Sequence, residues 1–356
     1  MVNEKCFELN WINGIKKSNA QLNPVYAENT IYAFELLSEL VNLNIDFVFK
    51  GGTSLLLHFP QPRRLSTDID IIGDFDLEIF DAIIKKNPRF QGFKDADRKH
   101  DLPMIKNLGF YYDTVLPDVD DQFVLLDIIK AKPRFPKIEE KEIKCDLLET
   151  DEALIVKIPT VESLLGDKLT AFAPDTIGIP LEDDTFRPVN VIKQLFDISL
   201  LFDAANDLQE INEAYNMSHK LNCEIRDQHF KIDETLNDTI QTCLELSSEG
   251  FSVGRNYAQT IMNKGCNRLN QFLISEPFSV NLAKKHAAKV ALIATILKKE
   301  RFDLKLIDLK YTKKKIEQLR DAKIHARFSK LMPLKESDAE AFYYWYLTSQ
   351  IEEGKL

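Results

Sequence analysis

Hydrophobic residues recur at two different spacings along this chain of 356 residues. Up to about residue 205, helical spacing, as in residues 29–43 (NTIYAFELLSELVNL), alternates with short apolar runs typical of buried strands, as in residues 122–130 (QFVLLDIIK). Beyond that point strand signals fade and helical spacing dominates. The pattern therefore predicts an α+β protein, with strands and helices mixed in residues 1–205 and a mainly α-helical domain in residues 206–356.

A glycine pair stands between a predicted strand and a predicted helix. The run DFVFK stops at Gly51 and Gly52, and the next two residues, Thr53 and Ser54, are placed to cap a helix. The amides and the positive dipole end of such a helix start can hold phosphate oxygens, and glycine lets phosphates approach the backbone closely. The turn is not a Walker loop, because the spacing G-x-x-x-x-G-K-[ST] is absent. We expect the amides of this helix start to bind phosphate groups.

Two aspartates follow in the segment TDIDIIG, which alternates acidic and aliphatic residues. On a strand, Asp68 and Asp70 would share one face about 6.5–7 Å apart. Two carboxylates on a mostly buried element are costly unless a cation neutralises them. Two other D-x-D pairs lack this context, because residues 74–76 lie outside the strand and residues 118–120 lie in an acidic, loop-like stretch. Asp68 and Asp70 are therefore predicted to bind a divalent metal ion that accompanies a nucleoside triphosphate.

Charge is unevenly distributed along the chain, whose net charge is -10. Residues 284–330 contain fifteen Lys or Arg but only five Asp or Glu, so this segment is strongly basic within an acidic protein. Such a block is typical of a phosphate-binding surface, because lysines can displace counterions from a polyanion. A solvated helix face has the same composition, and both interpretations stay open.

The cysteines and the apolar runs of the sequence argue against several classes of protein. Five widely scattered cysteines, none in a C-x-x-C pair, argue against a disulfide framework and against a zinc knuckle. The sequence has no run of about 18 apolar residues, and its first residues lack the basic-then-apolar order of a signal peptide. We expect a soluble cytoplasmic protein with no membrane partner.

Two aromatic features have a simpler explanation than ligand binding. His58 stands beside a phenylalanine and is interpreted as a packed side chain. Residues 342–346 (FYYWY) could stack on bases, but their helical spacing favours a place in the core of the C-terminal domain.

The stretch FVFKGGTSLLLHFPQPRRLSTDIDI resembles the K-G-G-T-x-L…R-x-S-T-D-I-D signature of AbiEii-type nucleotidyltransferases. These are the toxin halves of bacterial abortive-infection and toxin–antitoxin pairs, within the superfamily that has the DNA polymerase β fold. The segment IPTVESLLGDKLTAF resembles a further motif and places the family's lysine at Lys168. The segment KQLFDIS places its last acid at Asp197, with Lys193 and Gln194 where the family has Arg-Asp. The resemblance covers roughly residues 25–205.

The resemblance implies a nucleotidyltransferase fold, a mixed sheet flanked by helices, for residues 1–205. It also implies a metal-dependent transfer of a nucleotide from an NTP to a hydroxyl group. It implies Mg²⁺, or Mn²⁺, as the cofactor. The metal ligands would be Asp68, Asp70 and Asp127, and Asp127 would also help to deprotonate the attacking hydroxyl. The residues that bind the nucleotide would be Gly51, Gly52, Thr53, Ser54 and Lys168, with Asp197 orienting Lys168 or contacting the nucleotide. Arg64 would either bind phosphate or brace the D-x-D strand.

The acceptor is the least constrained part of the prediction. RNA, especially tRNA, is expected from the basic segment 284–330 and from what related toxins do, and an antitoxin is an expected partner. The acceptor could instead be a protein side chain or a small molecule. A different class of function is a non-catalytic toxin or regulator that binds NTP in the same pocket.

Overall fold

The computed structural model forms two compact units. The N-terminal unit contains Met1–Thr160 and Asn270–Pro277, and the helical unit contains Val161–Leu269 and Phe278–Leu356. The predicted domain boundary near residue 205 stays a prediction, although the compact units themselves divide earlier. The structure describes residues 1–16, 20–59, 61–96, 102–120, 122–180, 187–248, 256–274, 277–315 and 317–356.

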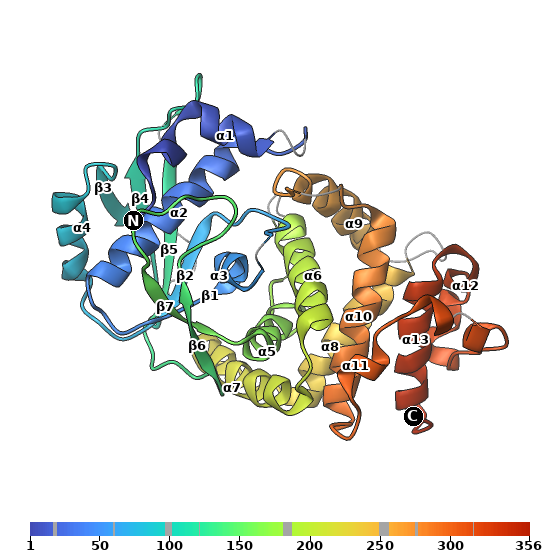
Figure 1. Cartoon of the computed structure of the whole chain (residues 1–356). Coiled ribbons are helices and arrows are strands. Elements are labelled where there is room, and N and C mark those ends of the chain that lie inside the picture. Colours follow the sequence, from blue (N-terminus) through green and yellow to red (C-terminus); the bar gives the residue numbers. More distant parts are fainter. Residues whose placement is uncertain are drawn as a thin grey trace. The chain divides into compact units, whose positions relative to one another are not determined.

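The N-terminal unit is built on a five-stranded sheet with the strand order β1-β2-β5-β4-β3 (Figure 1). Strands β2 and β5 run parallel, and the other neighbouring pairs are antiparallel. This sheet, with the helices around it, confirms the predicted α+β class and the mixed sheet. The strands are β1 (Val48–Lys50), β2 (Asp68–Ile72), β3 (Gly92–Asp95), β4 (Ile105–Tyr112) and β5 (Gln122–Ile129).

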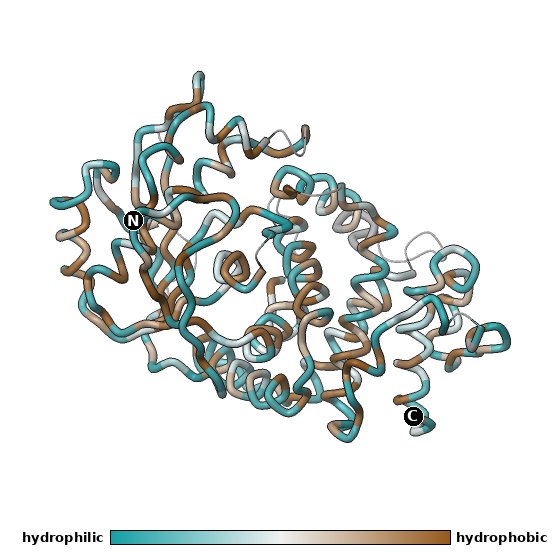
Figure 2. The backbone as a smooth tube through the Cα atoms, viewed as in Figure 1, coloured by the Kyte–Doolittle hydropathy of each residue, from teal (hydrophilic) through white to brown (hydrophobic). Residues whose placement is uncertain are grey.

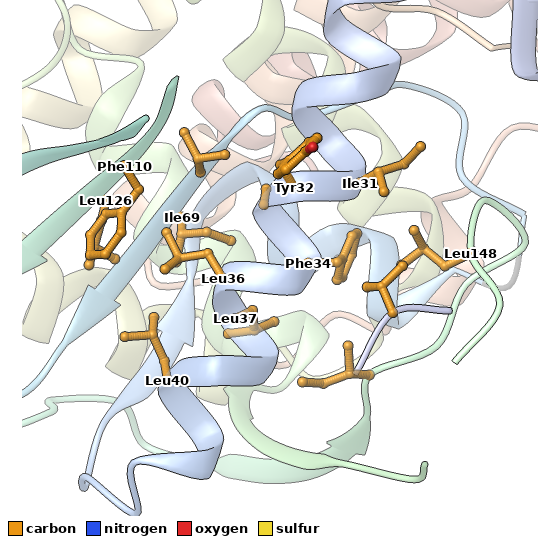
Figure 3. Packing of buried hydrophobic residues seen from close by; sticks show 14 of the residues in the cluster. Ile31, Tyr32, Phe34, Leu36, Leu37, Leu40, Ile69, Phe110, Leu126 and Leu148 are labelled. Carbon is orange, nitrogen blue, oxygen red and sulfur yellow. The ribbon is translucent and has the colours of Figure 1, made fainter. Parts of the chain in front are cut away.

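One face of this sheet is covered by helix α2 (Pro24–Asn42). The helix has a proline in its first turn, and the Asn23 side chain caps it by accepting a hydrogen bond from the amide of Val25. Figure 3 shows side chains of α2, among them Leu36, pointing towards Ile69 of β2 and Leu126 of β5, and all three are fully buried. Because side chains alternate across a strand, the neighbours of these residues in sequence face the other side of the sheet.

Shorter elements complete the N-terminal unit. A separate two-stranded sheet pairs β6 with β7. The remaining elements are η1 (Glu4–Phe7), α1 (Leu9–Lys16), α3 (Gly51–His58), η2 (Leu77–Phe80), α4 (Asp81–Lys86), β6 (Ile138–Glu142) and β7 (Ile155–Pro159).

A segment from much later in the chain also belongs to the N-terminal unit. The amide of Leu65 donates a hydrogen bond to the carbonyl of Phe272, and the amide of Ile274 donates one to the carbonyl of Arg63. The ring of Phe272 stacks on Tyr26, with 4.0 Å between the ring centroids. Residues 270–274, which we call the returning segment, therefore pair with the chain just before β2.

The helical unit packs several long helices around α10, and hydrophobic and hydrophilic residues alternate along them (Figure 2). Residues 342–345 of α13 are at most 4% exposed, which confirms that these four aromatic residues are core, whereas Tyr346 is half-buried. Among the described residues, no helix combines the length and the hydrophobicity needed to cross a membrane. The elements are α5 (Val161–Ala171), α6 (Arg187–Ala204), α7 (Leu208–Arg226), α8 (Ile232–Ser247), α9 (Asn256–Leu269), α10 (Val280–Lys298), α11 (Leu306–Leu309), η3 (Lys313–Lys315), η4 (Glu317–Leu319), η5 (Ala326–Leu331), α12 (Leu334–Ser337) and α13 (Ala339–Glu352).

The basic residues of segment 284–330 have two kinds of environment. Several pair with carboxylates from outside the segment, so that part of its formal charge is neutralised locally. These ion pairs are Lys285–Glu340, Lys289–Asp203 and Lys299–Glu352, at 3.1, 2.7 and 3.1 Å. Other cations of the segment are exposed, among them Lys313, Lys314, Arg320 and Lys323.

Candidate functional site

Four polar residues form a row across the sheet of the N-terminal unit. Lys50 of β1 is opposite Asp70 of β2, Asp70 is opposite Asp127 of β5, and Asp127 is opposite Asn107 of β4. Residues opposite one another in a sheet share a face, so all four side chains lie on the face that α2 leaves uncovered. Asp68 lies on the same face, two residues before Asp70. The register thus places the three predicted carboxylates on one face of the sheet, although Asp127 is more than fifty residues away in the chain.

Asn107 is a member of this row that the sequence analysis missed. Its side-chain amide donates a hydrogen bond to Oδ1 of Asp127, and both residues are half-buried. The hydrogen bond fixes the position of one oxygen of the carboxylate. The signal in the sequence was weak, because Asn107 is one polar residue in the strand-like run IKNLGFYY, and only the strand register shows what it faces.

The glycine pair forms the first turn of α3 and does not precede the helix. Lys50 is the N-cap residue, its side chain makes no capping hydrogen bond, and the helix begins at Gly51. The prediction that Thr53 or Ser54 caps the helix is therefore wrong. Both are fully buried, and their hydroxyls donate to the backbone carbonyls of Asp68 and Gly51, respectively. The hydroxyl protons of both residues are therefore already used in hydrogen bonds to the backbone.

Both glycines are required by what lies against them. Gly51 has a φ of +79°, and a Cβ atom there would overlap the carboxylate of Asp70. A Cβ atom on Gly52 would lie 2.7 Å from Nη2 of Arg64 and 2.8 Å from Oγ of Ser66. The start of α3 is therefore packed directly against the D-x-D strand and against a guanidinium group.

Arg64 is 7% exposed, and its Nη1 donates to the carbonyl of Leu65 at 2.8 Å. The side chain therefore supports the segment that leads into β2 and also places positive charge beside Gly52. Both roles considered for Arg64, bracing and phosphate binding, are compatible with this position.

The carboxylates suit a divalent cation chemically. Like charges directly opposite each other on neighbouring strands, as at Asp70 and Asp127, are destabilising on their own, and carboxylate oxygens are the ligands that magnesium prefers. Within the described part of the chain, no three His, Cys, Asp or Glu side chains converge closely enough to hold a metal ion.

The predicted Lys168 and Asp197 form a buried ion pair in the helical unit. Nζ of Lys168 on α5 lies 2.8 Å from Oδ2 of Asp197 on α6, and the two side chains are 5% and 0% exposed. Nζ also donates to Oε1 of Gln194 at 3.2 Å. Gln194, one of the two positions that depart from the family pattern, thus contacts the lysine of that pattern.

His58 has a structural environment at the end of α3. Its side chain is 1% exposed, with Nε2 2.9 Å from the carbonyl of Pro159 and Nδ1 3.4 Å from a carboxylate oxygen of Glu139. The interpretation of His58 as a packed side chain is confirmed.

Comparison with known protein families identifies the family of this chain. The family described as "Nucleotidyl transferase AbiEii toxin, Type IV TA system" matches residues 35–246, more than half of the chain. The chain belongs to this family. The resemblance seen in the sequence is thereby confirmed, and membership in the AbiEii family makes the protein a nucleotidyltransferase associated with toxin–antitoxin systems. No curated protein matches the chain significantly.

Several solved structures are similar to this AbiEii-family chain at low sequence identity. The nucleotidyltransferase toxin MenT4 of Mycobacterium tuberculosis has 12% identity and a TM-score of 0.49, covering 95% of this chain and 98% of its own. A nucleotidyltransferase of H. pylori has 15% identity and a TM-score of 0.40, covering 78% and 98%. A nucleotidyltransferase-like protein of Paracoccidioides brasiliensis has 17% identity and a TM-score of 0.34, covering 56% and 89%. The family assignment rests on the sequence match alone.

Proposed function

We propose that this AbiEii-family protein is a toxin that transfers a nucleotide from an NTP to a hydroxyl group of RNA, with tRNA as the favoured acceptor, and that the transfer depends on a divalent metal ion. The observation that carries the proposal is the strand register. It aligns Asp70 with Asp127, and the Asp70 carboxylate lies against Gly51 at the start of helix α3.

The chemistry divides among residues of the N-terminal unit. Asp68 and Asp70 would hold the metal ion together with Asp127, and the amides of Gly51 and Gly52 would hold the β and γ phosphates. A bound magnesium or manganese ion supplies charge stabilisation at the α-phosphate and at the leaving pyrophosphate.

The transfer forms one phosphorus–oxygen bond and breaks another. The acceptor oxygen attacks the α-phosphorus, and the bond from that phosphorus to the pyrophosphate oxygen breaks. Asp127 accepts the proton of the attacking hydroxyl, while the hydrogen bond from Asn107 keeps its carboxylate in position. Lys168 would neutralise the triphosphate, with Asp197 orienting its ammonium group.

An RNA acceptor is supported by the exposed cations of segment 284–330. Lys313, Lys314, Arg320 and Lys323 can displace counterions from a phosphate backbone, in contrast to the lysines of the segment that are paired with carboxylates. As the toxin of a toxin–antitoxin pair, the protein would also have an antitoxin as a partner.

The test is transfer of label from an NTP, supplied with magnesium, to total tRNA by the purified protein. The wild-type protein should release pyrophosphate and label RNA, and Asp70→Ala should abolish both. The thermal melt of Asp70→Ala should stay within a few degrees of wild type or rise, because removing a like charge relieves repulsion. Asp74→Ala is the matched control, since this exposed aspartate belongs to a D-x-D pair outside the strand and should leave transfer unchanged.

Other outcomes would identify the alternatives. A large loss of stability in Asp70→Ala would mean that the acids are structural. Pyrophosphate release without labelled RNA would point to a protein or small-molecule acceptor. NTP binding without turnover, unaffected by Asp127→Ala, would identify a nucleotide sensor and contradict the proposal.

A further inference from the structure

Two aromatic rings lie side by side on the sheet face that carries the acids. Tyr111 of β4 is directly opposite Phe123 of β5, and the ring centroids are 5.5 Å apart. Phe123 is an even number of residues from Asp127, as Tyr111 is from Asn107, so both rings share the face of the acid row. Phe123 is 45% exposed, which is unusual for so large an apolar side chain, and Tyr111 is half-buried.

A glycine and a lysine shape the surroundings of these rings. Gly109 lies on the same face between Tyr111 and Asn107, and a Cβ atom there would lie 3.1 Å from the ring of Phe123. The absence of a side chain at Gly109 lets the phenyl ring lie along the sheet. Lys94 of β3 is opposite Gly109, is exposed, and holds its Nζ 5.0 Å from the centroid of the Tyr111 ring. We call Tyr111, Phe123 and Lys94 the aromatic platform.

The order of the strands places this platform on one side of the acids and the glycine turn on the other. The turn follows β1 at one edge of the sheet, the acids are on β2 and β5, and the platform extends over β5, β4 and the opposite edge strand β3 (Figure 1). If the glycine turn holds the triphosphate, the acceptor hydroxyl must approach Asp127 from the platform side. Along β5, Phe123 is four residues from Asp127, or about 13 Å.

We propose that the aromatic platform stacks an unpaired base near the end of the RNA acceptor, with Lys94 beside the neighbouring phosphate. This inference rests on the proposed function and locates its acceptor. Exposed aromatic side chains on a sheet are a common means of holding unpaired bases, and an adjacent cation adds attraction for the backbone. A distance of about 13 Å suits a base one or two nucleotides before the reacting hydroxyl.

The loop between β4 and β5 argues for an unpaired end and against a duplex. It carries the exposed residues Asp113, Asp118 and Asp120 at the end of the sheet next to the platform. These carboxylates repel phosphates, so the surface favours few phosphates beyond the stacked base. An unpaired RNA end presents one or two phosphates beside this loop, whereas a double helix presents two continuous strands of phosphates.

The test measures RNA binding by the full chain without NTP or metal. The probe is an RNA hairpin with an unpaired 3′ tail that carries 2-aminopurine one nucleotide before its end, whose fluorescence falls when the base stacks. Wild-type protein should quench the tail probe and bind it more tightly than the same hairpin with a blunt end. Phe123→Leu and Tyr111→Leu should weaken binding of the tail probe about 5- to 100-fold and remove the quenching.

Three variants make the result specific. Phe123→Trp keeps a stacking ring and should restore quenching. Ile155→Ala removes a side chain of β7 that is 49% exposed and should bind the tail probe like wild type. Asp70→Ala removes a candidate catalytic acid and should still bind and quench.

The outcomes separate this inference from the proposed function. Quenching that depends on the platform, in a protein that transfers no nucleotide, would support base stacking by the platform and contradict the proposed nucleotide transfer. Normal transfer to RNA with Phe123→Leu, with unchanged KM for RNA, would overturn the platform and uphold the function. A raised KM for the NTP alone in Phe123→Leu would assign the platform to the donor base and contradict the inference.

Discussion

At the scale of single residues, the site depends on two positions that have no side chain. Gly51 leaves room for the Asp70 carboxylate, and Gly52 leaves room for the guanidinium of Arg64. The sequence alone indicated both glycines and both aspartates, because the strand–glycine–helix order and the D-x-D alternation are local patterns. It could not indicate that Asn107 holds Asp127, because that contact depends on the pairing of two strands.

The steric role of Gly51 leads to a prediction about Gly51→Ala. This variant should lose most of its transfer activity, because the new methyl group displaces Asp70 and the positive φ costs about 1–2 kcal/mol. Transfer to tRNA and a denaturant melt measure the two effects. Gly14→Ala is the control, since nothing lies within 4 Å of a Cβ atom there and the change removes a glycine from helix α1. It should leave activity intact and raise stability by up to about 1 kcal/mol; full activity of Gly51→Ala would contradict the steric role.

At the scale of secondary-structure elements, one buried charge pair links α5 to α6. The sequence indicated Lys168 and Asp197 only through the family motifs, and charged residues on helices are usually solvated. The structure instead buries both side chains and links them at 2.8 Å. Burial could not be inferred from helical spacing, because spacing defines which residues share a face but not which neighbouring helix covers that face.

Variants of this buried pair can distinguish a structural role of the two residues from a catalytic role. Lys168→Met should destabilise the protein by about 3–5 kcal/mol, because Asp197 is left buried without its partner charge. The double variant Lys168→Met with Asp197→Leu should recover most of that stability, because neither charge is then buried. Chemical denaturation measures both changes. Transfer activity should stay absent in the double variant if Lys168 neutralises the triphosphate, and an active double variant would restrict the pair to a structural role.

At the scale of the whole molecule, the chain combines a sheet-based unit with a helical unit, as the change of hydrophobic spacing predicted. The spacing could not fix where the compact units divide, because the helices α5 and α6 continue the pattern seen before residue 160. Nor could composition show how the basic segment 284–330 is used. Its charge is partly neutralised by Asp203, Glu340 and Glu352, which lie outside the segment in sequence.

The proposed toxin activity is a property of the whole protein in a cell. Expression of the wild-type chain alone should slow growth, because nucleotide addition to tRNA would deplete functional tRNA. Asp68→Ala should not slow growth at equal protein levels, as measured by growth curves with matched immunoblots. Equal toxicity of the two proteins would exclude nucleotide transfer as the cause.

The returning segment, residues 270–274, has a consequence for synthesis of the protein. The segment forms backbone hydrogen bonds with Arg63 and Leu65 and stacks Phe272 on Tyr26, yet it is made long after the sheet that it joins. A nascent chain on the ribosome therefore cannot complete the surroundings of the D-x-D strand until about three quarters of the chain has been translated. Truncated translation products that end before this segment would lack a finished site, which would protect the producing cell from partial copies of its own toxin.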